Sequence, residues 1–252
     1  MRESKNICRL CLEEKELTYE HYPPKSAFNK QTQFYSIDYS DYAKNFRDYH
    51  TDGVIKSKIY QGGLGDYVLC EDCNNFLGIT YVRDYVKFAK ICMSILNQYE
   101  DIKGMALTLK RNEVNLKYFL KQVASIFISC NQLYFAEDNP ELINFIRDKD
   151  TPVLSDRYRF YLYLNNEGQI KNGLHMFTNL YGGICEFTFA PFGIVLNIDN
   201  PNRIDTIYEM TNFKNYDNLT SDKFELLLNK YPSYTPVPLD FRSKNEVDKI
   251  FL

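Results

Sequence analysis

Two Cys-x-x-Cys pairs constrain the fold of this chain more than any other feature of its sequence. Cys8 and Cys11 lie in "CRLC", and Cys70 and Cys73 lie in "CEDC", far along the chain. A two-residue spacer lets both thiolates of a pair point at one centre, about 2.3 Å from each sulfur. Two pairs complete a tetrahedron, and four thiolates suit Zn²⁺ or an iron–sulfur cluster. We therefore expect a structural zinc site that joins the two pairs.

The other three cysteines lack this spacing. Cys92, Cys130 and Cys185 are interpreted as small hydrophobic residues of the core. A set of disulfides is the weaker alternative, because seven cysteines would leave one thiol unpaired. The segment "MRESKNICRL" has no apolar stretch typical of a signal peptide, and no apolar run approaches the ~20 residues that cross a bilayer. We expect a cytoplasmic protein without membrane contacts, whose thiols stay reduced.

Composition fits a folded protein with a substantial core. The 252 residues are 44% hydrophobic and 15% aromatic. The net charge of -3 is spread evenly, and no segment is a polyanion-binding tail. This weakens the case for tight nonspecific binding of nucleic acid, which depends on Lys and Arg neutralising several phosphates. A local basic face is left open.

Helical periodicity follows the second cysteine pair. Apolar residues at three- and four-residue steps predict one helix face, formed by Tyr81, Tyr85, Phe88, Cys92 and Ile95. A second helix is expected within residues 112–135. A shorter one is expected within 139–150, with Asn139 as its N-cap and Pro140 in its first turn. Upstream, "LTYEHY" predicts a short strand that carries Glu20 and His21.

From about residue 153 the pattern alternates as in strands. Tyr158, Phe160, Leu162 and Leu164 alternate with Arg157, Arg159, Tyr161 and Tyr163, which predicts an antiparallel sheet over 153–200 with one buried face. The tail, 219–252, predicts one helix and then a proline-rich extended segment. The expected fold class is α+β, with an N-terminal zinc module (1–80), a helical segment (81–150) and a C-terminal antiparallel β-rich domain (151–252) that includes a helix and the extended tail.

Three motifs taken together, "CRLC", "EHYPP" and "LCEDCNN", resemble the HNH endonucleases. The resemblance is to the branch in which two Cys-x-x-Cys pairs bind a structural zinc around a ββα-metal core, and it covers about the first 80 residues. It implies an HNH-like module that hydrolyses phosphodiester bonds of DNA with Mg²⁺ or Mn²⁺. It also suggests a bacterial phage-defence effector.

By this resemblance, His21 is the general base, Glu20 is one ligand of the catalytic divalent ion, and Asn74 or Asn75 is the other. The residue types suit these roles. A neutral imidazole near pH 7 can take a proton from water, and oxygen ligands hold a hard cation that stabilises charge on the phosphate. Catalysis then requires folding to bring His21 close to one of the two asparagines.

The chain departs from the family pattern at one position. The family usually carries an asparagine about five residues before the second pair, and this chain has Gly65 there, followed by Asp66. Either Asp66 replaces that group from the next position, or the site lacks it. In an inactive zinc module, Glu20 and His21 would instead be a turn carboxylate and a packed imidazole.

Three functions from different classes are left open by the sequence. The first is the metal-dependent DNA nuclease. The second is a catalytically silent zinc module that binds nucleic acid or a nucleotide. The third is a module that binds a protein partner through its helices and sheet, with zinc as architecture only.

Overall fold

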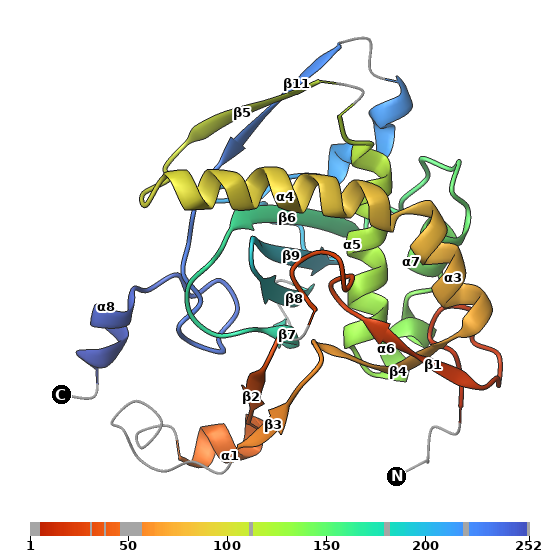
Figure 1. Cartoon of the computed structure of the whole chain (residues 1–252), viewed down its shortest axis with the longest axis horizontal. Coiled ribbons are helices and arrows are strands. Elements are labelled where there is room, and N and C mark those ends of the chain that lie inside the picture. The colour runs from red at the N-terminus through yellow and green to blue at the C-terminus, as the bar shows by residue number, and fades with distance from the viewer. Residues whose placement is uncertain are drawn as a thin grey trace.

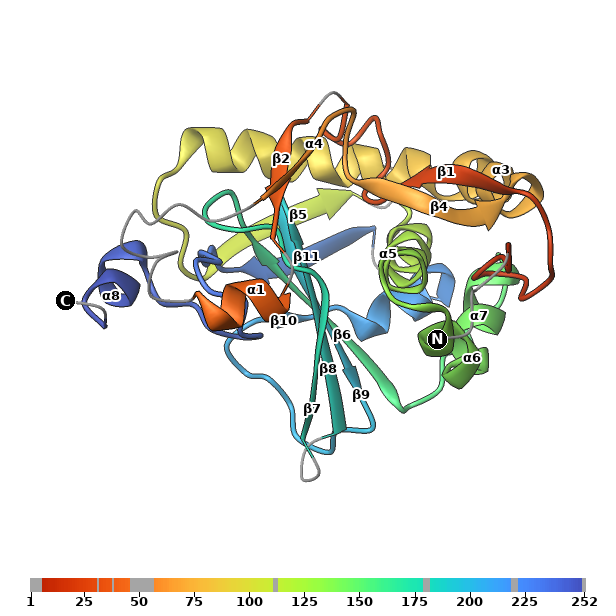
Figure 2. The same cartoon turned by 90° about the horizontal axis from the view of Figure 1, so that it is seen from below.

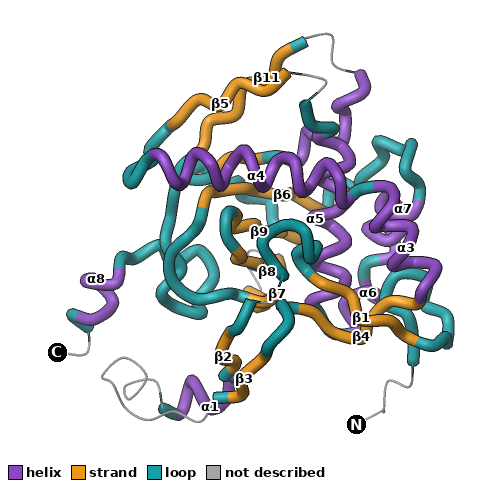
Figure 3. Tube along the Cα trace, in the orientation of Figure 1, coloured by secondary structure: helices purple, strands orange, loops and turns teal. Residues whose placement is uncertain are grey.

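Short strands and helices are mixed in the first half of the chain, and a longer run of strands follows (Figures 1 and 3). The computed structural model describes residues 6–30, 32–37, 39–45, 57–110, 113–178, 182–218 and 222–250. In chain order the elements are β1 (Leu17–His21), β2 (Phe34–Ser36), α1 (Tyr39–Lys44), β3 (Lys58–Tyr60), β4 (Gly65–Cys70), α3 (Glu71–Thr80), α4 (Val82–Gln98), β5 (Met105–Lys110), α5 (Leu116–Cys130), α6 (Leu133–Asp138), α7 (Pro140–Arg147), β6 (Tyr158–Leu164), β7 (Asn172–Thr178), β8 (Gly182–Phe189), β9 (Phe192–Ile198), β10 (Tyr208–Glu209), the 3-10 helix η1 (Thr211–Asn218), β11 (Lys223–Leu228) and α8 (Lys244–Asp248).

The largest sheet has five strands in the order β10-β6-β9-β8-β7, and every neighbouring pair is antiparallel. The prediction of an antiparallel sheet over 153–200 is therefore confirmed. Figure 2 shows strands β6 to β9 side by side, with α4 above them and α5 alongside. The mixture of helices with antiparallel sheets agrees with the coarse fold class that the sequence predicted.

Helices α4 and α5 cover one face of this sheet with aromatic side chains. The ring of Phe119 on α5 lies 4.8 Å from that of Phe88 on α4 and 5.5 Å from that of Phe192 on β9. Tyr81, Phe88 and Cys92 are buried, as the predicted helix face requires. Edge-to-face and tilted contacts of this kind add to the free energy of burying the rings. This packing fixes the two helices against the sheet.

The other face of the sheet is also buried, so the prediction of a single buried face is wrong. Tyr161 and Tyr163 are both fully buried, in a second apolar cluster. The rings of Tyr231 and Phe241, from the stretch after β11, stack at 4.4 Å and pack against this cluster. Gly193 lies opposite Tyr163, and any Cβ there would overlap the tyrosine ring. The alternation of residues in β6 does not predict that this second face is buried, because the side chains that cover it come from a distant part of the chain.

The expected helix before the proline-rich stretch is a strand. β11 pairs with β5 along its whole length, and β5 interrupts the segment expected to be helical. In β11, Leu226 and Leu228 are buried, whereas Leu227 between them is exposed. Because Leu227 is as apolar as its buried neighbours, the sequence does not show the alternation typical of a strand. Three consecutive leucines instead favour the prediction of a helix. A short helix, α8, does occur near the C-terminus and begins with a capping box at Ser243.

One continuous set of buried side chains draws on all three segments of the sequence, including Leu10, Phe88 and Leu196. Cys92 and Cys185 lie within it, and Cys130 packs against it. All three thiols are free. This agrees with their interpretation as small hydrophobic residues.

A buried ion pair ties the C-terminal stretch to the sheet. The Lys171 ammonium donates to the Glu186 carboxylate at 2.8 Å and to the carbonyl of Val237 at 2.9 Å. Glu186 also accepts from the hydroxyl of Tyr163 at 2.5 Å and from the Leu239 N–H at 3.0 Å. Both charged side chains are almost wholly excluded from solvent. Such a pair is tolerated only because each charge is satisfied by several partners.

We expect Lys171→Met to lower the free energy of unfolding by about 3–5 kcal/mol, because it leaves the Glu186 charge buried without its cation. Urea unfolding followed by circular dichroism measures this change. The exposed Lys103→Met serves as the control and should change stability little. The double variant Lys171→Met/Glu186→Gln should recover part of the loss. If Lys171→Met is as stable as the wild type, the buried pair does not hold this part of the fold.

Candidate functional site

The four cysteines of the two Cys-x-x-Cys pairs meet at one point, and we call them the cysteine cluster. Their sulfur atoms all lie within 4.8 Å of one another. The Cys11 and Cys70 sulfurs are 3.9 Å apart. A tetrahedral zinc with Zn–S bonds of about 2.3 Å requires sulfur–sulfur distances of about 3.8 Å. The donor set and its spacing therefore fit a structural zinc ion, as predicted, and it is the one such cluster found among the described residues.

Local backbone geometry shapes both pairs. In the first, the Leu12 N–H donates to the Cys8 carbonyl at 2.8 Å, and Leu12 takes a positive φ of 60° that turns the chain back. In the second, Cys70 is the N-cap of α3 and Cys73 lies in its first turn. The N-terminus of a helix favours negative charge. It therefore favours thiolates, which are the form that binds metal.

Hydrogen bonds within the cluster prepare one sulfur to carry charge. The thiol of Cys73 donates to Cys8 and, with backbone N–H groups of Cys70, Cys11 and Leu10, lowers the pKa of Cys8 to about 4 although burial opposes it. The same bond raises the pKa of Cys73. The lowered pKa favours the thiolate form of Cys8, which is the form that binds a metal ion. A divalent cation would stabilise the remaining thiolates in turn.

We expect purified protein to contain one zinc ion per chain, and Cys70→Ser to lose it and melt at a lower temperature. The reason is that structural zinc contributes directly to the free energy of folding. Elemental analysis and thermal melts measure the two effects. Cys92→Ala is the matched control: it alters a buried cysteine outside the cluster and should keep the zinc. A folded Cys70→Ser protein with full zinc content would contradict this assignment.

The cysteine cluster lies where β1, β4 and α3 come together. β1 and β4 pair antiparallel, which places Glu20 opposite Asp66 and His21 opposite Gly65. α3 follows β4 without a break, because it begins directly after Cys70. The strand with Glu20 and His21 is thereby held against the first turns of α3. The predicted short strand around these two residues is confirmed as β1.

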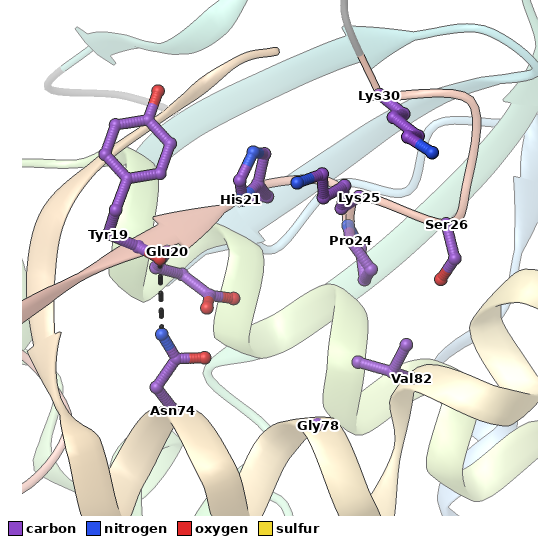
Figure 4. A pocket seen from close by; sticks show the side chains of 10 residues that line it. All are labelled: Tyr19, Glu20, His21, Pro24, Lys25, Ser26, Lys30, Asn74, Gly78 and Val82. Carbon is purple, nitrogen blue, oxygen red and sulfur yellow. Dashed lines mark hydrogen bonds between the residues drawn. The ribbon is translucent and has the colours of Figure 1, made fainter. Parts of the chain in front are cut away.

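Glu20 points from β1 into a cavity of about 450 Å³, which we call the Glu20 pocket and which is also lined by His21, Lys25, Lys30 and Asn74 (Figure 4). The side chain is only 8% exposed. Burial raises the pKa of the carboxyl group from its ordinary value of 4.5 to about 8. Within the described part of the chain, no hydrogen bond or ion pair reaches this carboxylate. It is a buried acid that lacks a cation.

Asn74 faces Glu20 from the first turn of α3, and its amide orientation is fixed. Its Nδ2 donates to the Thr18 hydroxyl at 3.0 Å and to the Tyr19 carbonyl at 3.3 Å. The Thr18 hydroxyl itself donates to the Leu69 carbonyl, so it accepts from Asn74. The Asn74 oxygen is therefore turned to the same space as the Glu20 carboxylate (Figure 4). Asn75 is exposed and does not line the pocket.

His21 follows Glu20 at the end of β1 and also lines the pocket, but its ring points away from Asn74, toward the side on which Lys25 lies (Figure 4). Its Nε2 lies 3.2 Å from the carbonyl oxygen of Gly62. A carbonyl can only accept, so Nε2 is the donor in this bond, and Nδ1 is the acceptor nitrogen of the neutral ring. The ring also meets Tyr19 edge-on, with centroids 4.9 Å apart. These contacts hold the imidazole at the rim of the Glu20 pocket.

The departure at Gly65 has a steric cause. A Cβ on Gly65 would lie 2.2 Å from the Glu20 carbonyl oxygen and 2.7 Å from the Tyr19 ring, so no side chain fits there. Asp66 is exposed, and its carboxylate accepts from the Tyr67 N–H at 2.8 Å. Among the described contacts none joins Asp66 to His21. Asp66 lies opposite Glu20 in the ribbon, whereas Gly65 lies opposite His21.

A buried asparagine that the sequence did not reveal fixes the backbone around His21. Asn29 is fully buried. Its Nδ2 donates to the carbonyls of Pro23 and Leu64 at 2.7 and 2.8 Å, and its Oδ1 accepts from the Leu64 N–H at 2.7 Å. It thus links the exit of β1 to the entry of β4. The surrounding sequence, "SAFNKQ", contains no motif that predicts this role.

Glu20 gives a prediction for pH dependence in protein without added Mg²⁺ or Mn²⁺. Its folded-state pKa is raised, so between about pH 5 and pH 8 the folded chain holds a proton that the unfolded chain has released. The free energy of unfolding should therefore fall as pH rises, by up to about 1.4 kcal/mol per unit from this group. Glu20→Gln should show a shallower fall in urea unfolding across this range. Equal slopes for both proteins would mean that Glu20 is solvated.

Comparisons with known proteins give no relative. No family model, no curated protein and no solved structure matches this chain. Among the described residues, no helix is both long and apolar enough to cross a membrane.

Proposed function

We propose that the Glu20 pocket is the active site of a divalent-metal-dependent endonuclease of the HNH type, which hydrolyses phosphodiester bonds of DNA. The observation that carries the proposal is that Glu20, His21 and Asn74 line one pocket. The cysteine cluster joins the elements that present them. The pairing of β1 with β4, followed by α3, supports the proposal, because the resemblance implies a ββα arrangement.

Glu20 and Asn74 would hold the catalytic Mg²⁺ or Mn²⁺. Their oxygens face the same space, and hard divalent cations prefer carboxylate and amide oxygens, with water and phosphate completing the shell. The buried carboxylate without a counter-charge supports this role, because a cation there would offset the cost of its burial. When bound, the ion would stabilise negative charge on the phosphate and on the leaving oxygen.

His21 would act as the general base. Its Nδ1 takes a proton from the attacking water, whose oxygen forms a bond to phosphorus as the bond to the leaving oxygen breaks. The Gly62 carbonyl, which accepts from Nε2, holds the ring during this transfer and stabilises the imidazolium that forms. The packing of Tyr19 against the ring further limits its rotation. Asn29 positions the loop on which this arrangement depends.

Two lysines would bind the substrate's phosphates. Lys25 and Lys30 line the pocket and are exposed, and neither makes a salt bridge in the described structure. Figure 4 shows both side chains on the His21 side of the pocket. A few local cations of this kind can position a phosphate without an overall basic charge. The weakly acidic composition is therefore compatible with a nucleic-acid substrate.

We expect His21→Ala to reduce plasmid cleavage by at least about 10²-fold in the presence of Mg²⁺ or Mn²⁺, because the water loses its proton acceptor. Zinc content and thermal stability should change little, since the ring is at a pocket rim. A gel assay of supercoiled plasmid, run beside elemental analysis and melting curves, measures all three. Asn75→Ala is the matched control on the neighbouring, exposed position and should cleave like the wild type.

The alternative is a catalytically silent zinc module that binds nucleic acid, a nucleotide or a protein partner. Asn74 favours it in one respect, because its amide bonds to β1 would serve a purely structural role as well. Absence of cleavage by wild-type protein with either metal ion would support this alternative. The role as a phage-defence effector rests on the resemblance alone. Protection of cells by the wild type but not by His21→Ala would test it.

A further inference from the structure

Three aromatic rings form a continuous row on the β1–β4 ribbon beside the Glu20 pocket. The Tyr19 ring lies 4.9 Å from His21 and 5.3 Å from Tyr67, with interplanar angles of 73° and 79°. Tyr19 and Tyr67 are direct cross-strand neighbours. The row therefore runs from the proposed general base to the outer end at Tyr67.

The inner ring of this row is fixed, and the outer ring is open. The Tyr19 hydroxyl donates to the Gly63 carbonyl at 3.2 Å, and its ring packs over Gly65, where no side chain fits. Tyr67 leans edge-on against Tyr19 but is 63% exposed. Its position is set by the ribbon that the cysteine cluster closes, while most of its surface is accessible. A rigid, exposed aromatic ring next to a catalytic group is suited to stack on a planar ligand.

We propose that Tyr67 is a stacking platform for an unpaired base, so that the substrate is single-stranded where it is cleaved. This rests on the proposed nuclease function and names its substrate class. Inside a duplex the faces of a base are covered by its neighbours, and only an unpaired base offers a face to a side chain. Only the Tyr19 ring separates Tyr67 from His21 along the row, so a strand stacked on Tyr67 would bring a neighbouring phosphate toward the pocket rim.

Several cations and one carboxylate lie around the row. Lys25 and Lys30 line the pocket, and Lys58 on β3 places its ammonium 4.8 Å from the centre of the Tyr60 ring. The exposed Asp66, next to Tyr67, adds one negative charge at the outer end. Aromatic rings with a few interspersed cations are the usual surface for single strands, because stacking supplies much of the affinity. A duplex-binding surface instead needs many phosphate contacts. The net charge of -3 fits the first case better.

The same contact could serve only the ribbon, since cross-strand tyrosine pairs stabilise two-stranded sheets. The tests therefore need a binding signal that a purely structural role would not produce. The chain contains no tryptophan. Tyr67→Trp consequently gives a single indole at the platform, and stacking of a base on it quenches its fluorescence.

The binding experiment uses Tyr67→Trp in the His21→Ala background, which prevents cleavage. Short single-stranded DNA and RNA oligonucleotides and the matching DNA duplex are titrated separately. We expect saturable quenching by a single strand and at least about fivefold weaker binding of the duplex. Comparing DNA with RNA identifies the preferred sugar. Tyr99→Trp in the same background, at an exposed position just beyond the far end of α4, is the control and should not be quenched. Equal quenching by the duplex, or equal quenching of the control variant, would overturn the proposal.

The cleavage experiment uses the otherwise unaltered chain. Tyr67→Ala should slow cleavage of single-stranded oligonucleotides at least about fivefold with an unchanged melting temperature, and Tyr67→Phe should recover most of the loss. If wild-type protein cleaves duplex and single strand equally and Tyr67→Ala has no effect, Tyr67 is not a stacking platform, and the proposed nuclease function is retained. If single strands quench the indole of the Tyr67→Trp variant but the wild-type protein cleaves no substrate, the proposed nuclease function is wrong. The role of Tyr67 as a stacking platform is then retained.

Discussion

The meeting of four cysteine sulfurs at one point is the contact on which the position of every proposed site residue depends. β1 and β4 form a sheet of only two strands, and such a sheet is marginally stable by itself. The chain between the two pairs is long, so closing it costs conformational entropy. A metal ion bound by both pairs would hold this closure. It would thereby keep Glu20 on β1 opposite Asn74 on α3.

Features that depend on local spacing could be predicted from the sequence. The cysteine cluster follows from two short spacers, and the helix face through Tyr81 and Phe88 follows from a simple period. The choice between Asn74 and Asn75 could not be predicted, because it depends on the rotational phase of α3. That helix begins at Glu71, one residue after its N-cap cysteine, and this start turns Asn74 toward β1 and Asn75 toward solvent.

Features that depend on distant contacts could not be predicted in this way. Tyr161 and Tyr163 alternate with apolar residues as an exposed strand face would, yet residues 231–241 cover them. β11 has the composition of a helix but finds a partner in β5. Nothing in the sequence around Asn29 indicates its role. That role depends on three backbone groups of Pro23 and Leu64, which only the folded chain brings to its side chain. In each case the deciding partner lies elsewhere in the chain.

Arg9 connects the cysteine cluster to the C-terminal end of α5, away from the Glu20 pocket. Its side chain, placed between Cys8 and Cys11, donates to the Ser129 carbonyl at 2.6 Å, in the last turn of α5. That turn has no basic residue of its own, so Arg9 supplies the positive charge that a helix C-terminus favours. Nearly all of α5 is buried. Loss of a metal ion from the cysteine cluster would therefore loosen both the surface ribbon and the end of this central helix, and local opening of this kind would expose the chain to proteases.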